Sequence, residues 1–334
     1  MSWFLFALVC TLGWGLADMF YKKGSDETDR YSHLRIAVWV GFVMGLGAFG
    51  IMIFRGGMGS LRELLGNALR YAPASLSYIV SMVIGYAGLR YLELSVVSPV
   101  QNASGALSMV AMLLFFMITG RVQNIGEAFS VLDLVGTGLI VVGVIALAVV
   151  EKKLEKEPEV LPSETPDPEP EASSEAASGR KYRVGALALL FPLLYCVFDT
   201  IGTAADGIIL DSEAGLGLGE TEVLVLYGLT FFLAGIAAFI FLWIREKKPY
   251  NLFAPKEHPK MAAAVAEEFG QIFYVFAMAR NPMLAAPMVA SYCIVSVLLS
   301  RIFLKEKLRT GQLLSVITVI AGIVLLGISE GLAG

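Results

Sequence analysis

Apolar residues along this chain gather in long blocks that are separated by short polar segments. A helix needs about 17–25 residues to cross roughly 30 Å of hydrocarbon at 1.5 Å per residue, and these blocks have that length. We therefore predict an all-α, polytopic membrane protein. Its ten transmembrane helices are expected at residues 3–20, 33–54, 71–91, 96–118, 131–150, 184–205, 221–244, 261–279, 283–303 and 310–329.

One polar segment between two blocks has a helical pattern of its own. In residues 60–70, Leu61, Leu65 and Leu69 recur at helical spacing among charged and polar residues. The segment is too short to cross a membrane. We expect a separate amphipathic helix that lies along the membrane interface.

The pattern of the first five blocks returns in the last five. An offset of 188 positions places Tyr86 over Tyr274 and Pro99 over Pro287. Two glycine pairs follow at similar offsets, Gly41 with Gly228 and Gly143 with Gly322. Because five spans are an odd number, the second copy has to enter the membrane in the opposite orientation. The predicted architecture is therefore a 5+5 inverted repeat, which is common among transporters.

This reading divides the chain into a first five-helix repeat (1–150), a linker (151–183) and a second five-helix repeat (184–334). Within the linker, residues 154–179 hold eight acids and one lysine, together with many prolines and serines. Such a segment has too few apolar side chains to form a core. It is expected to be disordered.

Composition supports the membrane assignment and excludes several functions. Hydrophobic residues make up 57% of the chain, charged residues 16%, and the mean hydropathy is +0.72, which is too apolar for a soluble surface. No basic tract indicates a nucleic-acid partner. The cysteines and the two histidines lack the spacing of a metal site, and no nucleophile–base pair or nucleotide-binding loop is found. We expect no enzyme activity, no cofactor and no metal.

The distribution of basic residues predicts an orientation. Lys and Arg number 17 in the odd-numbered connections between spans and 5 in the even-numbered ones. By the positive-inside rule, the odd-numbered connections lie in the cytoplasm and both termini lie outside.

Two acids occupy matching places inside apolar blocks. An offset of 181 superposes Trp14 on Tyr195 and Asp18 on Asp199. An acid at the centre of a membrane helix costs about 2.5–3.5 kcal/mol on insertion scales, and ionisable residues at that depth usually mark functional sites. For Asp18, an ion pair with Lys22 one turn later is an equal alternative. Asp199 has no such neighbour, so we favour a functional role for it.

Several segments resemble one known family. The WG in span one, the element GLRYLELSVVSP, and the stretch PMVASYCIVSVLLSRIFLKEKLRTGQLLSVITVIAGIVLLG are similar to the EamA-like ten-helix branch of the drug/metabolite transporter superfamily. Lys305 stands where the family's LGE-R loop has glycine. The resemblance covers nearly the whole chain apart from residues 151–183. It implies cytoplasmic termini, against the charge distribution, to which we give the greater weight.

The resemblance also implies a central cavity lined by spans one, three, four, six, eight and nine. Polar residues form stripes on three of these spans: Gln101, Ser104 and Ser108; Glu267, Gln271 and Tyr274; and Tyr292, Ser296 and Ser300. Asparagine, glutamine and serine also join membrane helices, for about 0.6 kcal/mol each, and that alternative stays open for any single residue. The predicted substrate- and proton-binding residues are Asp199, Glu267, Asp18, Trp14, Tyr195, Gln101, Asn102, Ser104, Gln271, Tyr274, Tyr292 and Ser296.

Glu268 directly follows Glu267 and therefore points about 100° away from it on a helix. We expect it to pair with Lys260 or Arg280 instead of facing the cavity.

These features together favour a secondary active transporter in the cytoplasmic membrane. It would move a small polar metabolite or drug, cationic or zwitterionic, by alternating access coupled to protons. Its partners would be that small molecule, protons and the lipid bilayer, and it would act as a monomer or homodimer. The competing hypothesis is a membrane receptor or assembly subunit that keeps the fold without transporting.

Overall fold

The computed structural model describes residues 2–26, 28–55, 60–91, 94–154, 190–211, 215–304 and 310–333. All regular structure in these ranges is helical. Within them, nine spans are long and apolar enough to cross a membrane, and the chain is a multi-pass membrane protein. The helices are α1 (Trp3–Gly24), α2 (Ser32–Phe54), α3 (Leu61–Gly88), α4 (Leu94–Gln101), α5 (Ser104–Ile118), α6 (Ile125–Ala128), α7 (Val131–Leu154), α9 (Leu190–Leu210), α10 (Glu220–Glu246), the short 3-10 helix η1 (Pro255–Glu257), α11 (His258–Met278), α12 (Pro282–Ala290), α13 (Tyr292–Leu304) and α14 (Thr310–Ala333).

The predicted separate helix at residues 60–70 is wrong, because this segment is the first part of α3. Ser60 starts the helix with a capping box. Its hydroxyl accepts from the Glu63 amide, and the Glu63 carboxylate accepts from the Ser60 amide. The helical hydrogen bonds of α3 continue through the polar residues of this segment. The start of the apolar block therefore does not mark the start of the helix. Leu61 and Leu69 remain exposed on this end.

Spans four and nine are each interrupted, where the sequence predicted continuous helices. The first interruption separates α4 from α5 at residues 102–103, and the second separates α12 from α13 at Ser291. Each follows a proline by about one turn, Pro99 or Pro287, and the chain there forms tighter bonds between residues three apart. The two breaks correspond at the same offset of 188 positions. Inside a membrane, backbone N–H and C=O groups that are not part of a helix are tolerated only where protein or a water-filled cavity surrounds them.

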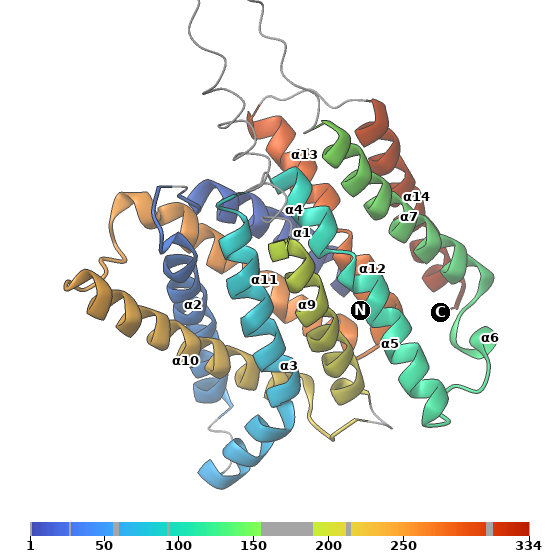
Figure 1. The fold of residues 1–334 in the computed structure, drawn as a ribbon. Coiled ribbons are helices and arrows are strands. Elements are labelled where there is room, and N and C mark those ends of the chain that lie inside the picture. Colours follow the sequence, from blue (N-terminus) through green and yellow to red (C-terminus); the bar gives the residue numbers. More distant parts are fainter. Residues whose placement is uncertain are drawn as a thin grey trace, which may run out of the picture.

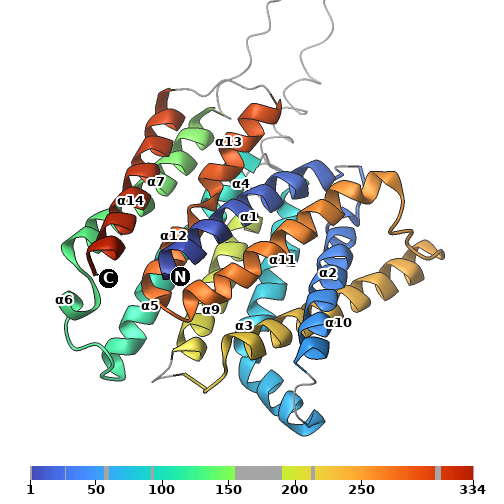
Figure 2. The ribbon, with the colours of Figure 1, turned by 180° about the vertical axis from the view of Figure 1, so that it is seen from behind.

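The helices pack as a bundle with a helix pair at each end. In Figures 1 and 2, α2 and α10 cross on one flank, while α7 and α14 lie side by side on the other. Between these flanks α1 packs against α11, α3 against α9, and α5 against α12. The central helices enclose the site described below.

Charged side chains close one end of the bundle, where α1, α2, α10 and α11 meet. Arg35 binds both Asp29, at 2.6 Å, and Glu246. Lys260 and Glu257 form a buried ion pair at 2.7 Å, and the Tyr250 hydroxyl also donates to Glu257. Burial and the neighbouring Glu257 carboxylate raise the pKa of Tyr250, so it stays protonated as a donor.

The predicted linker lies outside the described residues, apart from residues 151–154 at the end of α7, and so does Lys305. Ser300 lies in α13.

Candidate functional site

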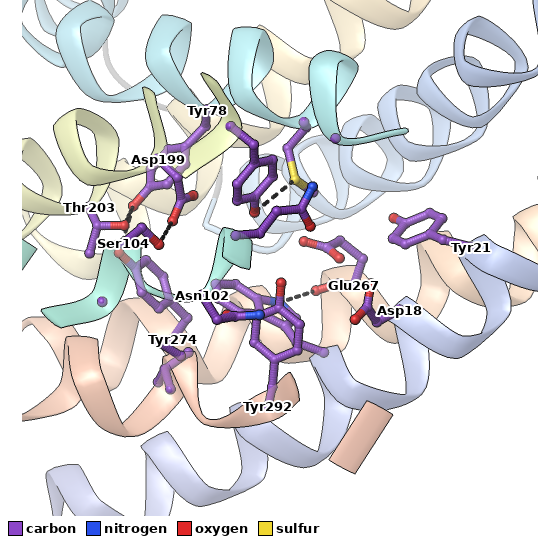
Figure 3. Close-up of a pocket in the computed structure, with 18 of the residues that line it drawn as sticks. Asp18, Tyr21, Tyr78, Asn102, Ser104, Asp199, Thr203, Glu267, Tyr274 and Tyr292 are labelled. Carbon is purple, nitrogen blue, oxygen red and sulfur yellow. Dashed lines mark hydrogen bonds between the residues drawn. The ribbon is translucent and has the colours of Figure 1, made fainter. Parts of the chain in front are cut away.

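A cavity lies in the middle of the bundle, between α1, α3, α9 and α11 and beside the breaks in spans four and nine (Figure 3). The structure brings ten of the twelve predicted site residues to its wall. They are Trp14, Asp18, Gln101, Asn102, Ser104, Tyr195, Asp199, Glu267, Tyr274 and Tyr292. Residues as far apart in the sequence as Trp14 and Tyr292, 278 positions, therefore line one cavity.

The two remaining predicted residues, Gln271 and Ser296, are buried without lining this cavity. The Ser296 hydroxyl donates to the Tyr292 carbonyl in its own helix and, at 3.4 Å, to the Gly15 carbonyl of α1. Those are contacts of the kind that join helices. The Gln271 amide nitrogen has no hydrogen-bond partner among the described residues.

Each of the matched acids is held by a serine from span four. The Ser98 hydroxyl donates to Asp18 Oδ2 at 2.6 Å, and the Ser104 hydroxyl donates to Asp199 Oδ2 at 2.6 Å. Figure 3 shows the two carboxylates at opposite sides of the cavity. Lys22, the alternative partner for Asp18, donates to the Leu89 carbonyl at 2.9 Å. A hydroxyl donor orients a carboxylate without neutralising it, so both acids keep acceptor capacity toward the cavity.

Glu267 is the third acid of the cavity and projects from α11 toward Asp18 (Figure 3). Among the described residues, its carboxylate has no hydrogen bond or ion pair. Its backbone carbonyl accepts from the Trp14 indole at 3.3 Å.

The expected ion pair of Glu268 is not found in the described part of the chain. Lys260 contacts Glu257 instead, and Arg280 lies 3.8 Å from Glu220. The Glu268 carboxylate packs against Gly47 of α2, outside the cavity wall.

The cavity wall holds three acidic side chains without a basic partner among the described lining residues. Asp18, Asp199 and Glu267 line it, whereas none of the described lining residues is lysine, arginine or histidine. Buried charges are costly unless they are paired or neutralised. This arrangement suits protons or a cationic guest.

Aromatic rings form much of the remaining wall. The Trp14 ring stacks on Tyr274 with centroids 5.0 Å apart and meets the Tyr292 ring edge-on at 5.8 Å. Gly270 makes room for it, because a Cβ there would lie 2.2 Å from a carbon of the Trp14 ring. Across the cavity, Tyr21 and Tyr86 pack against each other at 4.8 Å. Aromatic faces attract cations through the negative face of the ring.

Gln101 supplies a further polar group. Its amide nitrogen is buried, lines the cavity and has no hydrogen-bond partner among the described residues. Gly85 leaves space for it, because a Cβ at that position would lie 2.9 Å from the nitrogen. An unsatisfied donor of this kind costs about 1–3 kcal/mol until a ligand or water accepts from it.

Sequence reasoning missed part of this site. Tyr21, Tyr78, Thr203 and Tyr227 also line the cavity, and Asp206 lies just beyond it in contact with Tyr78. For Asp206 a signal was available, because it follows Asp199 by seven residues and therefore lies on the same helical face. The tyrosines belong to apolar blocks in which many residues face inward, and their positions give no such indication.

Comparison with known proteins assigns one part of the chain to a family. Residues 214–328 form an EamA-like transporter family domain. This EamA domain contains α10 to α13 and most of α14, so it supplies Glu267, Tyr274 and Tyr292 to the cavity. Members of the family that this segment matches are membrane transporters and are generally not enzymes. The resemblance seen in the sequence is confirmed for these residues.

Whole-chain comparison extends the likeness in fold. A solved structure titled "Crystal structure of protein" superposes with a TM-score of 0.59 over 98% of this chain and 96% of its own, at 14% sequence identity. That level of identity supports the fold alone. No curated protein matches the sequence.

Proposed function

We propose that the protein is a secondary transporter that moves a small cationic or zwitterionic molecule, such as an amine or amino acid, by alternating access coupled to protons. The observation that carries the proposal is the cavity with three carboxylates and no basic side chain in its described wall. A cation entering this space would find opposite charge on both sides. An anion would meet repulsion strengthened by the low dielectric of the interior.

The rest of the wall favours a molecule that combines charge with other groups. Stacked rings at Trp14 and Tyr274 offer a face for an ammonium or an aromatic ring. The Gln101 amide and the Asn102 side chain offer hydrogen bonds that would fix its orientation. Cavities with few placed polar groups among aromatic rings are typical of small-molecule sites.

The proposal includes the inverted repeat, and the helix packing supports it. Exchanging each helix of the first half with its counterpart in the second preserves the most extensive helix–helix contacts. The contact between α1 and α11 becomes the contact between α9 and α3. The contacts α2–α10 and α7–α14 map onto themselves. The contact between α5 and α12 becomes the contact between α13 and α4, so spans four and nine pack on each other in both cases.

Glycine contacts repeat the same exchange at the level of single residues. A Cβ on Gly41 would meet the Phe231 carbonyl and Gly235, and a Cβ on Gly228 would meet the Met44 carbonyl and Ala48. At an offset of 187, Gly41 maps onto Gly228, Met44 onto Phe231 and Ala48 onto Gly235. The two glycine contacts are equivalent under this exchange, which supports a duplicated unit.

Asp199 gives the most direct test. The purified protein is first screened by thermal shift against tetramethylammonium, tryptamine, lysine and a neutral sugar, since binding to the folded form raises its apparent stability. The compound that stabilises most is then offered as a radiolabelled probe to proteoliposomes that contain a trapped pH dye. Transport predicts uptake of the probe together with decay of the imposed pH gradient.

Asp199→Asn should abolish both signals, because it removes a charge that the cation requires. Glu268→Gln is the matched control, since it neutralises a carboxylate in the same membrane region outside the cavity, and it should transport normally. Normal uptake in Asp199→Asn would contradict the proposal. A thermal shift without any uptake by the wild type would favour the receptor function instead.

A further inference from the structure

Asp206 lies in α9 on the side of the cavity away from the ion pairs of Arg35 and Lys260. It is completely buried, and one of its oxygens, Oδ1, has no hydrogen-bond partner among the described residues. A carboxylate in this position is costly unless it is neutralised. The cavity residues that would bind a cation do not include it, so its presence needs a separate explanation.

Tyrosine side chains surround Asp206. Tyr71 and Tyr78 face it from α3, Tyr227 from α10 and Tyr274 from α11, and Asp199 is the nearest acid along α9. The buried Tyr71 hydroxyl faces the Asp206 carboxyl group, but no hydrogen bond of good geometry forms between them. Neighbouring Gly207 packs tightly against Met112, Met278 and Pro282, so the described side chains that pack there are apolar.

One hydroxyl connects Asp206 with the cavity. The Tyr78 oxygen lies 3.4 Å from Asp206 Oδ2, 3.2 Å from the Thr203 hydroxyl and 2.6 Å from the Tyr274 hydroxyl. Thr203 lines the cavity beside Asp199, as Figure 3 shows. Tyr274 reaches the cavity through its ring, which stacks on Trp14.

We propose that Asp206 is a second proton-binding site, separate from the cation site, and that the Tyr78 hydroxyl links it to the cavity. This inference rests on the proposed function, because it identifies where the coupling proton is held. In the relay, Asp206 gives its proton to Tyr78 Oη while Tyr78 passes its own proton to Thr203 Oγ1. Thr203 releases a proton into the cavity, so each hydroxyl ends neutral and only Asp206 changes charge.

The same contacts couple the proton to the shape of the cavity. A carboxylate at Asp206 accepts from Tyr78, whereas a protonated Asp206 donates to it and leaves the Tyr78 proton for Thr203 or Tyr274. Each state therefore favours a different arrangement of the hydroxyl of Tyr274, whose ring supports Trp14. Proton release at one end would in this way alter the aromatic wall that faces the substrate.

Infrared difference spectroscopy tests the proposal without any substrate. The carbonyl stretch of a protonated carboxyl group disappears when the group loses its proton. Spectra of the purified wild type in lipid nanodiscs, at acid against alkaline pH, should contain a carboxylic acid band that Asp206→Asn removes. Glu268→Gln, the matched control, should keep this band.

An unchanged set of bands in Asp206→Asn overturns the proposal. So does stabilisation of the wild type by sodium chloride that is lost in Asp206→Asn, because the site would then hold a metal cation. If Asp206→Asn does not fold, the Tyr78→Phe variant tests the proposal instead. Loss of its hydrogen bond should shift the Asp206 band, and an unshifted band contradicts the link. Because no transported molecule is used, this result is distinguishable from failure of the transport assay with Asp199→Asn.

Discussion

The hydroxyl oxygens of Tyr78 and Tyr274 lie 2.6 Å apart, which joins α3 to α11 at the edge of the cavity. Tyr78 belongs to the first half of the chain and Tyr274 to the second. The contact is buried and connects two helices that otherwise pack mainly against α9 and α1. A change in either hydroxyl therefore alters a contact between the two halves of the chain.

Tyr78→Phe should slow proton-driven uptake roughly tenfold and change probe binding little. The substitution removes a hydroxyl that three oxygens share and leaves a buried group unsatisfied, at a cost of about 1–3 kcal/mol. Uptake in proteoliposomes and the thermal shift with the same probe separate the two effects. Tyr91→Phe, at an exposed position just after α3, is the control and should behave like the wild type. Equal losses of binding and uptake would count against a relay.

Trp14→Ala should weaken binding of a cationic probe by about 3- to 30-fold, in line with the ~0.5–2 kcal/mol of a cation–π contact. Trp14→Phe retains an aromatic face and should recover most of the affinity. Thermal-shift titrations with tetramethylammonium measure both variants. If Trp14→Phe bound as weakly as Trp14→Ala, the indole would act through its 3.3 Å hydrogen bond to the Glu267 carbonyl instead.

Gly41→Ala should destabilise the protein by about 1–3 kcal/mol, because overpacked contacts force neighbours to move. The new Cβ would lie 2.4 Å from the Phe231 carbonyl oxygen and 2.8 Å from the Gly235 Cα. Gly50→Ala on the same helix is the matched control, since a Cβ there meets nothing within 4 Å. The unfolding temperatures of the two variants in detergent should differ clearly. Similar temperatures would show that α2 and α10 separate easily.

Lys260→Met should cost about 3–5 kcal/mol, because it leaves Glu257 buried and without its positive partner. Adding Glu257→Gln removes the orphaned charge and should restore much of the loss. Thermal unfolding of the two single variants and the double variant gives the coupling between them. Additive effects would mean that the pair contributes nothing beyond its separate side chains.

Cysteine labelling decides the orientation. The native cysteines Cys10, Cys196 and Cys293 are buried and should react slowly. The basic-residue distribution predicts that Lys248→Cys, after α10, faces the cytoplasm and that Gln123→Cys, after α5, faces outside. Both positions are exposed. In intact cells, an impermeant maleimide should label Gln123→Cys only. The reverse result would agree with the orientation that the family resemblance implies.

Much of the fold could be predicted, because crossing a membrane imposes length and hydropathy on each helix. Both ends of α2 and the C-terminal end of α5 agree with the predicted spans to within a residue. The start of α3 and the two breaks could not be predicted in this way. A capping box at Ser60 and the missing amide of a proline act through backbone hydrogen bonds, to which hydropathy is insensitive.

The predicted stripes of polar residues depended on periodicity, which identifies a helical face without showing what lies opposite it. It placed Glu267 and Tyr274 correctly at the cavity wall, yet included Gln271 on the same stripe. It gave no indication that Tyr78 would reach across from α3. Tertiary packing determines which side chains meet at the cavity, and the periodicity of one sequence does not reveal that packing.

The serines that hold the two matched acids differ in origin. Ser98 and Asp18 both come from the first half, so their bond travels intact with that half. Ser104 also belongs to the first half, but Asp199 belongs to the second, and their bond bridges the two. Rocking of one half against the other would therefore strain the bond between Ser104 and Asp199, whereas the bond between Ser98 and Asp18 would move with the first half. The serines of span four thus bind one matched acid across the two halves of the chain and the other within a single half.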